Sequence, residues 1–111
     1  MRGLYDKICI ETDGYKFIGY NIFGHANFAP KGKDIVCSAV SSIAQTAILG
    51  LNEILKKNII FEQDISLVFL KVMINNPDKD SDLIIRTMAL ALERLEKIYP
   101  QNISVKYNKL N

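Results

Sequence analysis

The chemistry available to this 111-residue chain centres on its one histidine and two cysteines. Eleven residues separate His25 from Cys37. A cysteine thiolate can attack a carbonyl carbon, and an imidazole can hold the thiol proton and later return it to a leaving amine. His25 and Cys37 are therefore the smallest set of residues that supports cleavage of a peptide bond by a thiol.

Cys37 lies where a helix is expected to begin. Asp34 can cap that helix, because its carboxylate can accept hydrogen bonds from the amides of the first turn. Cys37 would then lie in the first turn, where the positive end of the helix dipole favours the thiolate over the thiol. The same amides could stabilise an oxyanion, and the preceding loop is long enough to fold His25 back onto Cys37.

Plainer interpretations of these residues remain open. A cysteine on an apolar helix face is usually a small core residue, and a lone histidine near a turn is usually structural or solvated. Asp34 is a cap by default and less commonly a partner that orients His25. Cys9 lies in the middle of a predicted strand with no helix end beside it, so its expected role is structural. The serines that follow Cys37 lack a second histidine to activate them.

The elements that must position this pair follow from the pattern of apolar residues. Alternation of apolar and polar residues predicts strands over 4–12, 15–23, 59–62, 67–74 and 103–107. Apolar residues at helical spacing predict helices over 35–57 and 81–99. Asp13-Gly14 predicts a two-residue hairpin turn and Gln63-Asp64 a second turn, whereas 25–33 has the composition of a loop.

These elements follow the order ββαββαβ within a single domain that spans 1–111. Because hairpins dominate, we expect an α+β fold: a two-layer sandwich in which two helices cover one face of a mostly antiparallel sheet. The core stripe of the second helix is expected to consist of Ile84, Met88, Ala91, Leu95 and Ile98.

Further apolar residues lie outside this expected core. Those of the second helix are Leu83, Ile85, Ala89 and Leu92, and those of the outer sheet face are expected to be Phe17, Phe23, Phe69 and Met73. Much exposed apolar surface on a small domain is typical of a protein–protein interface. We therefore expect a homodimer.

Composition narrows the classes of function. Apolar residues make up 49% and charged residues 23%, and the net charge of +2 gives no reason to expect direct nucleic-acid binding. No apolar run approaches the roughly 20 residues of a membrane span and no signal peptide is evident, so we expect a cytoplasmic protein with no membrane partner. One histidine and two reduced cysteines are too few for a typical zinc site, so no metal or cofactor is expected.

Two short motifs resemble the pattern of the ribosomal-processing cysteine protease family, called Prp. They are Gly24-His25-Ala26 and Gly32-Lys33-Asp34-Ile35-Val36-Cys37-Ser38-Ala39-Val40-Ser41. The resemblance extends to chain length, the initial hairpin, the order of elements and the Ile-Ile-Arg-Thr-Met-Ala-Leu segment of the second helix. It implies a bacterial cysteine endopeptidase that removes a short N-terminal extension from the large-subunit ribosomal protein L27 during ribosome maturation.

The resemblance also implies roles for single residues. His25 and Cys37 match the catalytic dyad of the family, and Asp34 and Ser41 match positions that support it. Gly24, Gly32 and Ser38 belong to the same motifs and are expected to support the site or bind substrate.

Two features depart from the family pattern. The loop over 27–31 contains Pro30 and is less glycine-rich than usual, and Ser38 stands where alanine is common.

The resemblance also implies a homodimer, in agreement with the exposed apolar surface. The alternative functions are a non-catalytic ribosome-associated binding module and a thiol enzyme that acts on a small molecule.

Overall fold

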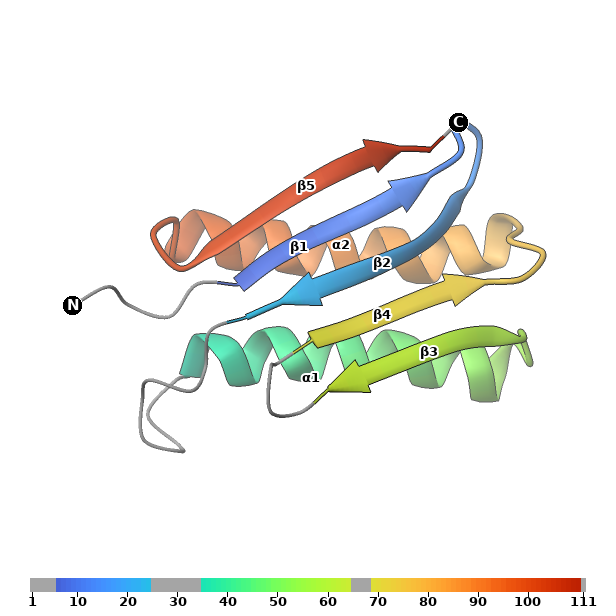
Figure 1. Ribbon diagram of the computed structural model, residues 1–111, viewed down its shortest axis with the longest axis horizontal. Coiled ribbons are helices and arrows are strands. Elements are labelled where there is room, and N and C mark those ends of the chain that lie inside the picture. Colours follow the sequence, from blue (N-terminus) through green and yellow to red (C-terminus); the bar gives the residue numbers. More distant parts are fainter. Residues whose placement is uncertain (1–5, 25–34, 65–68, 111) are drawn as a thin grey trace.

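Five strands form one sheet, and two helices cover one of its faces (Figure 1). The computed structural model describes residues 6–24, 35–64 and 69–110. Its elements are β1 (Asp6–Thr12), β2 (Phe17–Phe23), α1 (Ile35–Leu49), a π-helical continuation η2 (Gly50–Ile54), β3 (Ile59–Asp64), β4 (Phe69–Ile74), α2 (Lys79–Ile98) and β5 (Ile103–Lys109). The predicted α+β sandwich and the order ββαββαβ are confirmed.

The strands lie in the order β3-β4-β2-β1-β5. Three of the neighbouring pairs are antiparallel, and β1 with β5 is the parallel pair. The parallel pair forms because α2 crosses over the sheet between β4 and β5, whereas hairpins join the other neighbours in sequence. The first and last strands of the fold are thus neighbours.

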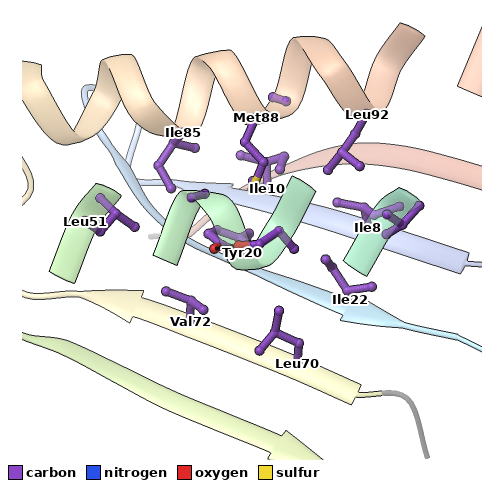
Figure 2. Close-up of a cluster of buried hydrophobic side chains, with 14 of the residues drawn as sticks. Ile8, Ile10, Tyr20, Ile22, Leu51, Leu70, Val72, Ile85, Met88 and Leu92 are labelled. Carbon is purple, nitrogen blue, oxygen red and sulfur yellow. Dashed lines mark hydrogen bonds between the residues drawn. The ribbon is translucent and has the colours of Figure 1, made fainter. Parts of the chain in front are cut away.

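The core lies between the sheet and the helices (Figure 2). Alternate residues of β1, β2 and β4 point into it, as expected for strands with one buried face: Ile8, Ile10, Tyr20, Ile22, Leu70 and Val72. The Tyr20 hydroxyl donates a hydrogen bond to the Ala44 carbonyl at 3.0 Å. Burial raises the pKa of Tyr20. This bond ties β2 to the middle of α1, two turns after Cys37.

The first hairpin is longer than the predicted two-residue turn. Residues 13–16 connect the paired residues Thr12 and Phe17. The Asp13 carboxylate accepts hydrogen bonds from the amides of Tyr15 and Lys16, both at 2.8 Å, which lowers the pKa of Asp13. The Asx-type contact therefore closes a four-residue loop, which the Asp-Gly pair alone does not reveal.

The predicted turn at Gln63-Asp64 was wrong, because both residues belong to β3. Gln63 pairs with Leu70 and Asp64 with Phe69. β3 is an edge strand whose last five residues are exposed, so polar side chains can continue it without a cost of burial.

Phe17 lies on the helix side of the sheet, so its predicted place on the outer face was wrong. The register shifts at Thr12, which pairs with Phe17 and leaves Ile18 as an extra residue. Such a bulge reverses the side on which the following residues lie. Phe17 accordingly packs against the core, with its ring centroid 6.3 Å from that of Tyr107.

The first helix changes geometry instead of running regularly to Lys57 as predicted. It becomes π-helical at Gly50, and Lys56 adopts a φ of 56°. In length and composition the 20 residues from Ile35 to Ile54 could cross a membrane, so the expectation that no apolar run approaches this length was wrong. However, the segment packs one face on the sheet, as a core helix does: Val36, Val40, Ala44, Ala47 and Leu51 are buried.

The second helix begins earlier than predicted, and its predicted core stripe is confirmed in part. Its N-cap is Asp78, and its first residue is Lys79. The buried apolar residues are Ile85, Met88, Ala89 and Leu92, whereas Ile98 is 66% exposed. Met88 belongs to the predicted stripe, and Ile84 and Leu95 pack against the edge of the core, but packing on the sheet buries the adjacent apolar row more completely.

Candidate active site

Cys37 is the third residue of α1, and it is half-buried. Its Sγ donates a hydrogen bond to Asp6 Oδ1, with 3.4 Å between the two atoms. The first turn of α1 contains no acidic side chain. The thiol therefore lies at the positive end of a helix dipole, as predicted, and beside a carboxylate that the sequence-based hypothesis did not include.

Asp6 is a residue of this site that the sequence reasoning missed. It is the first residue of β1 and only 2% exposed, and it shares the buried face of that strand with Ile8 and Ile10. The signal was present, because the predicted alternation places residue 6 on the same side as residues 8 and 10. An acidic side chain on the buried face of a strand is unusual and warrants a search for its partner.

The end of β2 brings the chain toward the same point. Lys7 of β1 pairs with Phe23 of β2 in antiparallel register. Continuing that register by one residue places Gly24 opposite Asp6, about 5 Å away across the strands. Figure 1 shows the end of β2 and the start of α1 at one end of the molecule. The segment that leads into His25 thus leaves the sheet beside the carboxylate that contacts Cys37.

The remaining predicted site residues divide into two groups. Ser38 and Ser41 are exposed on α1, and Ser41 lies one turn beyond Cys37 on the same face of the helix. Gly24 is partly exposed at the end of β2. His25, Gly32 and Asp34 lie outside the described residues, as does the predicted capping of α1 by Asp34.

The two thiols have different surroundings. Cys9 lies in β1 on the sheet face opposite to the helices, where it pairs with Asn21 of β2. Partial burial and, secondarily, the charge of Glu11 raise the pKa of Cys9. Cys9 therefore has little thiolate at neutral pH, and the structure agrees with its predicted structural role. Among residues 6–24, 35–64 and 69–110, no three histidine, cysteine or acidic side chains group as metal ligands would.

Comparison with known proteins bears directly on this arrangement. The family described as "Cysteine protease Prp" matches residues 7–104. Proteins named ribosomal processing cysteine protease Prp, from two strains of Staphylococcus aureus, are each 30% identical over 87 residues, which cover 76% of this chain and 80% of theirs.

Solved structures share the fold. The S. aureus protease Prp in complex with a covalently linked product peptide has a TM-score of 0.83 at 22% identity, covering 93% of this chain and 99% of that one. The protein SMU.848 from Streptococcus mutans also has a TM-score of 0.83, at 20% identity, covering 96% of this chain and 99% of its own.

Proposed function

This chain belongs to the Prp family of ribosomal-processing cysteine proteases, and from that membership we propose that Cys37 is its nucleophile and His25 the residue that transfers the proton. The observation that carries the proposal is the contact between Cys37 and Asp6, because Asp6 lies across the strands from Gly24. The residue after Gly24 is His25. The described backbone thus ends, one residue before His25, at the end of the sheet where the thiol lies, and this supports the proposed pairing of His25 with Cys37.

The chemistry follows from these parts. The Cys37 thiolate attacks the carbonyl carbon of the scissile bond, and the carbonyl oxygen becomes an oxyanion. The backbone amides of Cys37 and Ser38, in the first turn of α1, are the candidate donors to that oxyanion. The His25 imidazolium protonates the leaving amine, and water then hydrolyses the acyl-enzyme to release the N-terminal fragment.

The proposed substrate is the N-terminal extension of ribosomal protein L27. The names of the S. aureus relatives support a ribosomal protein as substrate, and the S. aureus structures hold a substrate or a product peptide. An extended peptide can add main-chain hydrogen bonds along a strand edge and the loop beside it. Gly24, Gly32, Asp34 and Ser41 would then support the site or contact the peptide. The enzyme is proposed to act in the cytoplasm, where ribosomes are assembled.

A homodimer is proposed from the exposed apolar surface. On the outer sheet face, the rings of Phe23 and Phe69 stack with centroids 4.9 Å apart, and Phe23 is 49% exposed. On α2, Leu83 is 67% exposed. Light scattering at micromolar concentration should give twice the mass of one chain, and a stable monomer would contradict this assignment.

The experiment that tests the dyad is cleavage of a peptide that copies the L27 extension. Mass spectrometry should find two fragments with the wild-type protein and none with Cys37→Ala. Cys9→Ala is the matched control, because it removes the other thiol from the opposite face of the sheet and should leave the rate unchanged. Cleavage by Cys37→Ala would remove Cys37 as the nucleophile. No cleavage by the wild-type protein, with the peptide still bound, would favour a binding module.

A further inference from the structure

A buried carboxylate touches the proposed nucleophile. Asp6 is 2% exposed, and its Oδ1 accepts the hydrogen bond from Cys37 Sγ. Burial of a charged side chain costs free energy unless surrounding groups compensate for it, so an acidic residue at such a position needs a reason. Its contact with the thiol supplies one.

The backbone holds Asp6 firmly in this place. Its amide donates a hydrogen bond to the Asn102 carbonyl at 2.8 Å, and the residue pairs with Ile103 in the parallel register of β1 and β5. Ile8 and Ile10, which share its face, are almost completely buried. The carboxyl group is therefore held on a strand whose inner face is buried, and it can fix the orientation of the thiol.

The charges around this pair are few among the described residues. α1 and β2 carry no charged side chain, and Lys7 points to the outer face of the sheet. On α2, the Glu96 carboxylate accepts a hydrogen bond from a β5 amide, while Arg94 and Lys97 are exposed. Among the described residues, the group in direct contact with the thiol is thus the Asp6 carboxyl.

We propose that Asp6 is a positioning residue for Cys37: its carboxylate holds the thiol over the start of β1 and opposes loss of the thiol proton. This inference rests on the proposed role of Cys37 as nucleophile. A negative charge at hydrogen-bond distance disfavours a second one, whereas the helix dipole favours it. Asp6 therefore keeps the nucleophile oriented and opposes part of the ionisation that the helix dipole and His25 favour.

Alkylation of the two thiols by iodoacetamide tests the effect of the charge. Asp6→Asn keeps an acceptor oxygen and removes the charge, so the rate-versus-pH curve of Cys37 should shift to lower pH by about one unit. That shift is about a tenfold faster rate at pH 6.5. The matched control is Glu11→Gln, which removes an acid from the same strand and should accelerate Cys9 only. An unshifted Cys37 curve in Asp6→Asn would overturn the proposal.

Cleavage kinetics test the positioning role. Asp6→Ala removes the acceptor as well as the charge, so kcat should fall roughly 10- to 100-fold, as expected when a reacting atom loses its orientation. KM should stay unchanged, because a side chain with 2% exposure does not reach substrate. Asp6→Asn should recover kcat to within a few-fold of the wild type. Equal losses in both variants, matched by equal losses of thermal stability, would show a purely structural role.

Infrared spectroscopy of protein with an intact Asp6 tests the proposal even if both Asp6 variants fail to fold. In Cys9→Ala protein, an infrared S–H stretching band near pH 6 should report Cys37 as a hydrogen-bonded thiol. Absence of this band would show a resting thiolate and overturn the proposal. The labelling and infrared results do not depend on cleavage. They can therefore contradict the role of Asp6 while the peptidase assay supports the proposed function, or support that role while the assay contradicts the function.

Discussion

The two helices of this protein begin in opposite chemical settings. At the start of α2, the Asp78 carboxylate accepts hydrogen bonds from the amides of Asp80 and Ser81, and the Ser81 hydroxyl accepts one from the Asp78 amide. Lys57 Nζ donates to the same carboxylate at 2.6 Å. This helix start is completed by side chains of its own segment and by Lys57, which lies in the connection between η2 and β3.

The start of α1 is different. Its first turn carries no acidic side chain, and it presents Cys37 and Ser38. Helix N-termini have unpaired amides that stabilise negative charge from any source. At the start of α2, two of these amides already bind the Asp78 carboxylate. At the start of α1, the proposed nucleophile Cys37 lies beside the amides, which can stabilise a negative charge that develops only during the reaction.

The largest expected effect comes from removing the chemistry at the start of α1. His25→Ala and Cys37→Ser should each lower the rate of peptide cleavage by a thousandfold or more, because a serine hydroxyl is scarcely ionised at neutral pH and a thiol without its imidazole lacks a proton donor for the leaving amine. Circular dichroism should show the fold intact. A rate within tenfold of the wild type in either variant would mean that α1 does not begin at the catalytic centre.

The next effect concerns the acidity of the two thiols. Near pH 6.5, iodoacetamide should label Cys37 about tenfold faster than Cys9, because a helix N-terminus and an imidazolium favour the Cys37 thiolate and burial raises the pKa of Cys9. In His25→Ala, labelling of Cys37 should slow. Tryptic peptides quantified over a range of pH values give both curves. Equal labelling rates for the two thiols would contradict the expectation that the start of α1 favours the Cys37 thiolate.

A smaller effect tests whether α1 has a cap of its own. Asp34→Ala should cost about 1 kcal/mol of unfolding free energy if the predicted cap forms, and cleavage should fall further than that loss explains. Asp34→Asn keeps the capping oxygen. Denaturant melts and cleavage rates separate the two roles of Asp34. If Asp34→Asn recovers both stability and cleavage, Asp34 acts only as a helix cap. If it recovers stability alone, the charge of Asp34 has a function in catalysis.

The smallest effect belongs to the start of α2, and it should be confined to stability. Asp78→Ala should lower Tm by a few degrees and leave cleavage unchanged, because Asp78 caps a helix without reactive groups. Asp80→Asn is the control, since it keeps the cap. A loss of catalytic rate beyond the loss of folded protein would link the two helix starts.

The pH dependence of this cap has a definite sign. The hydrogen bonds from Lys57 and from the Ser81 amide lower the pKa of Asp78 from 3.8 to about 2. A lowered folded-state pKa means that the stabilisation is complete above 3.8 and is lost as the pH falls toward 2. Thermal melts over this range should show a steeper loss of Tm in the wild type than in Asp78→Asn.

Local patterns predicted the elements better than the pairing between them. Alternation placed Ile8, Ile10 and Tyr20 correctly, because each belongs to an uninterrupted strand. Phe17 was misplaced because the bulge beside it depends on the partner strand. The stripe of α2 was only partly right, because the row that contains Ile85 is as apolar as the predicted one, and only contact with the sheet determines which is buried more completely.

The candidate site was likewise predictable where it depends on local sequence and not where it depends on contacts between elements. The position of Cys37 at a helix start was predictable, because it follows from the sequence next to it. The contact with Asp6 was not predictable, since the two residues are 31 positions apart in the sequence and three elements must assemble before the side chains meet. The burial of Asp6 was nevertheless implied by alternation, so a search for acids on buried strand faces would have found it.

The parallel pairing of β1 with β5 has a consequence for when the enzyme becomes competent. β1 emerges first during synthesis, but the carbonyl that holds the Asp6 amide belongs to Asn102, and the strand that flanks Asp6 runs to Lys109. Until the chain has been translated past that point, the first strand lacks its outer neighbour. In the nascent protein, the strand that contacts the proposed nucleophile is therefore unpaired on its outer side, and we expect peptidase activity only after β5 has docked.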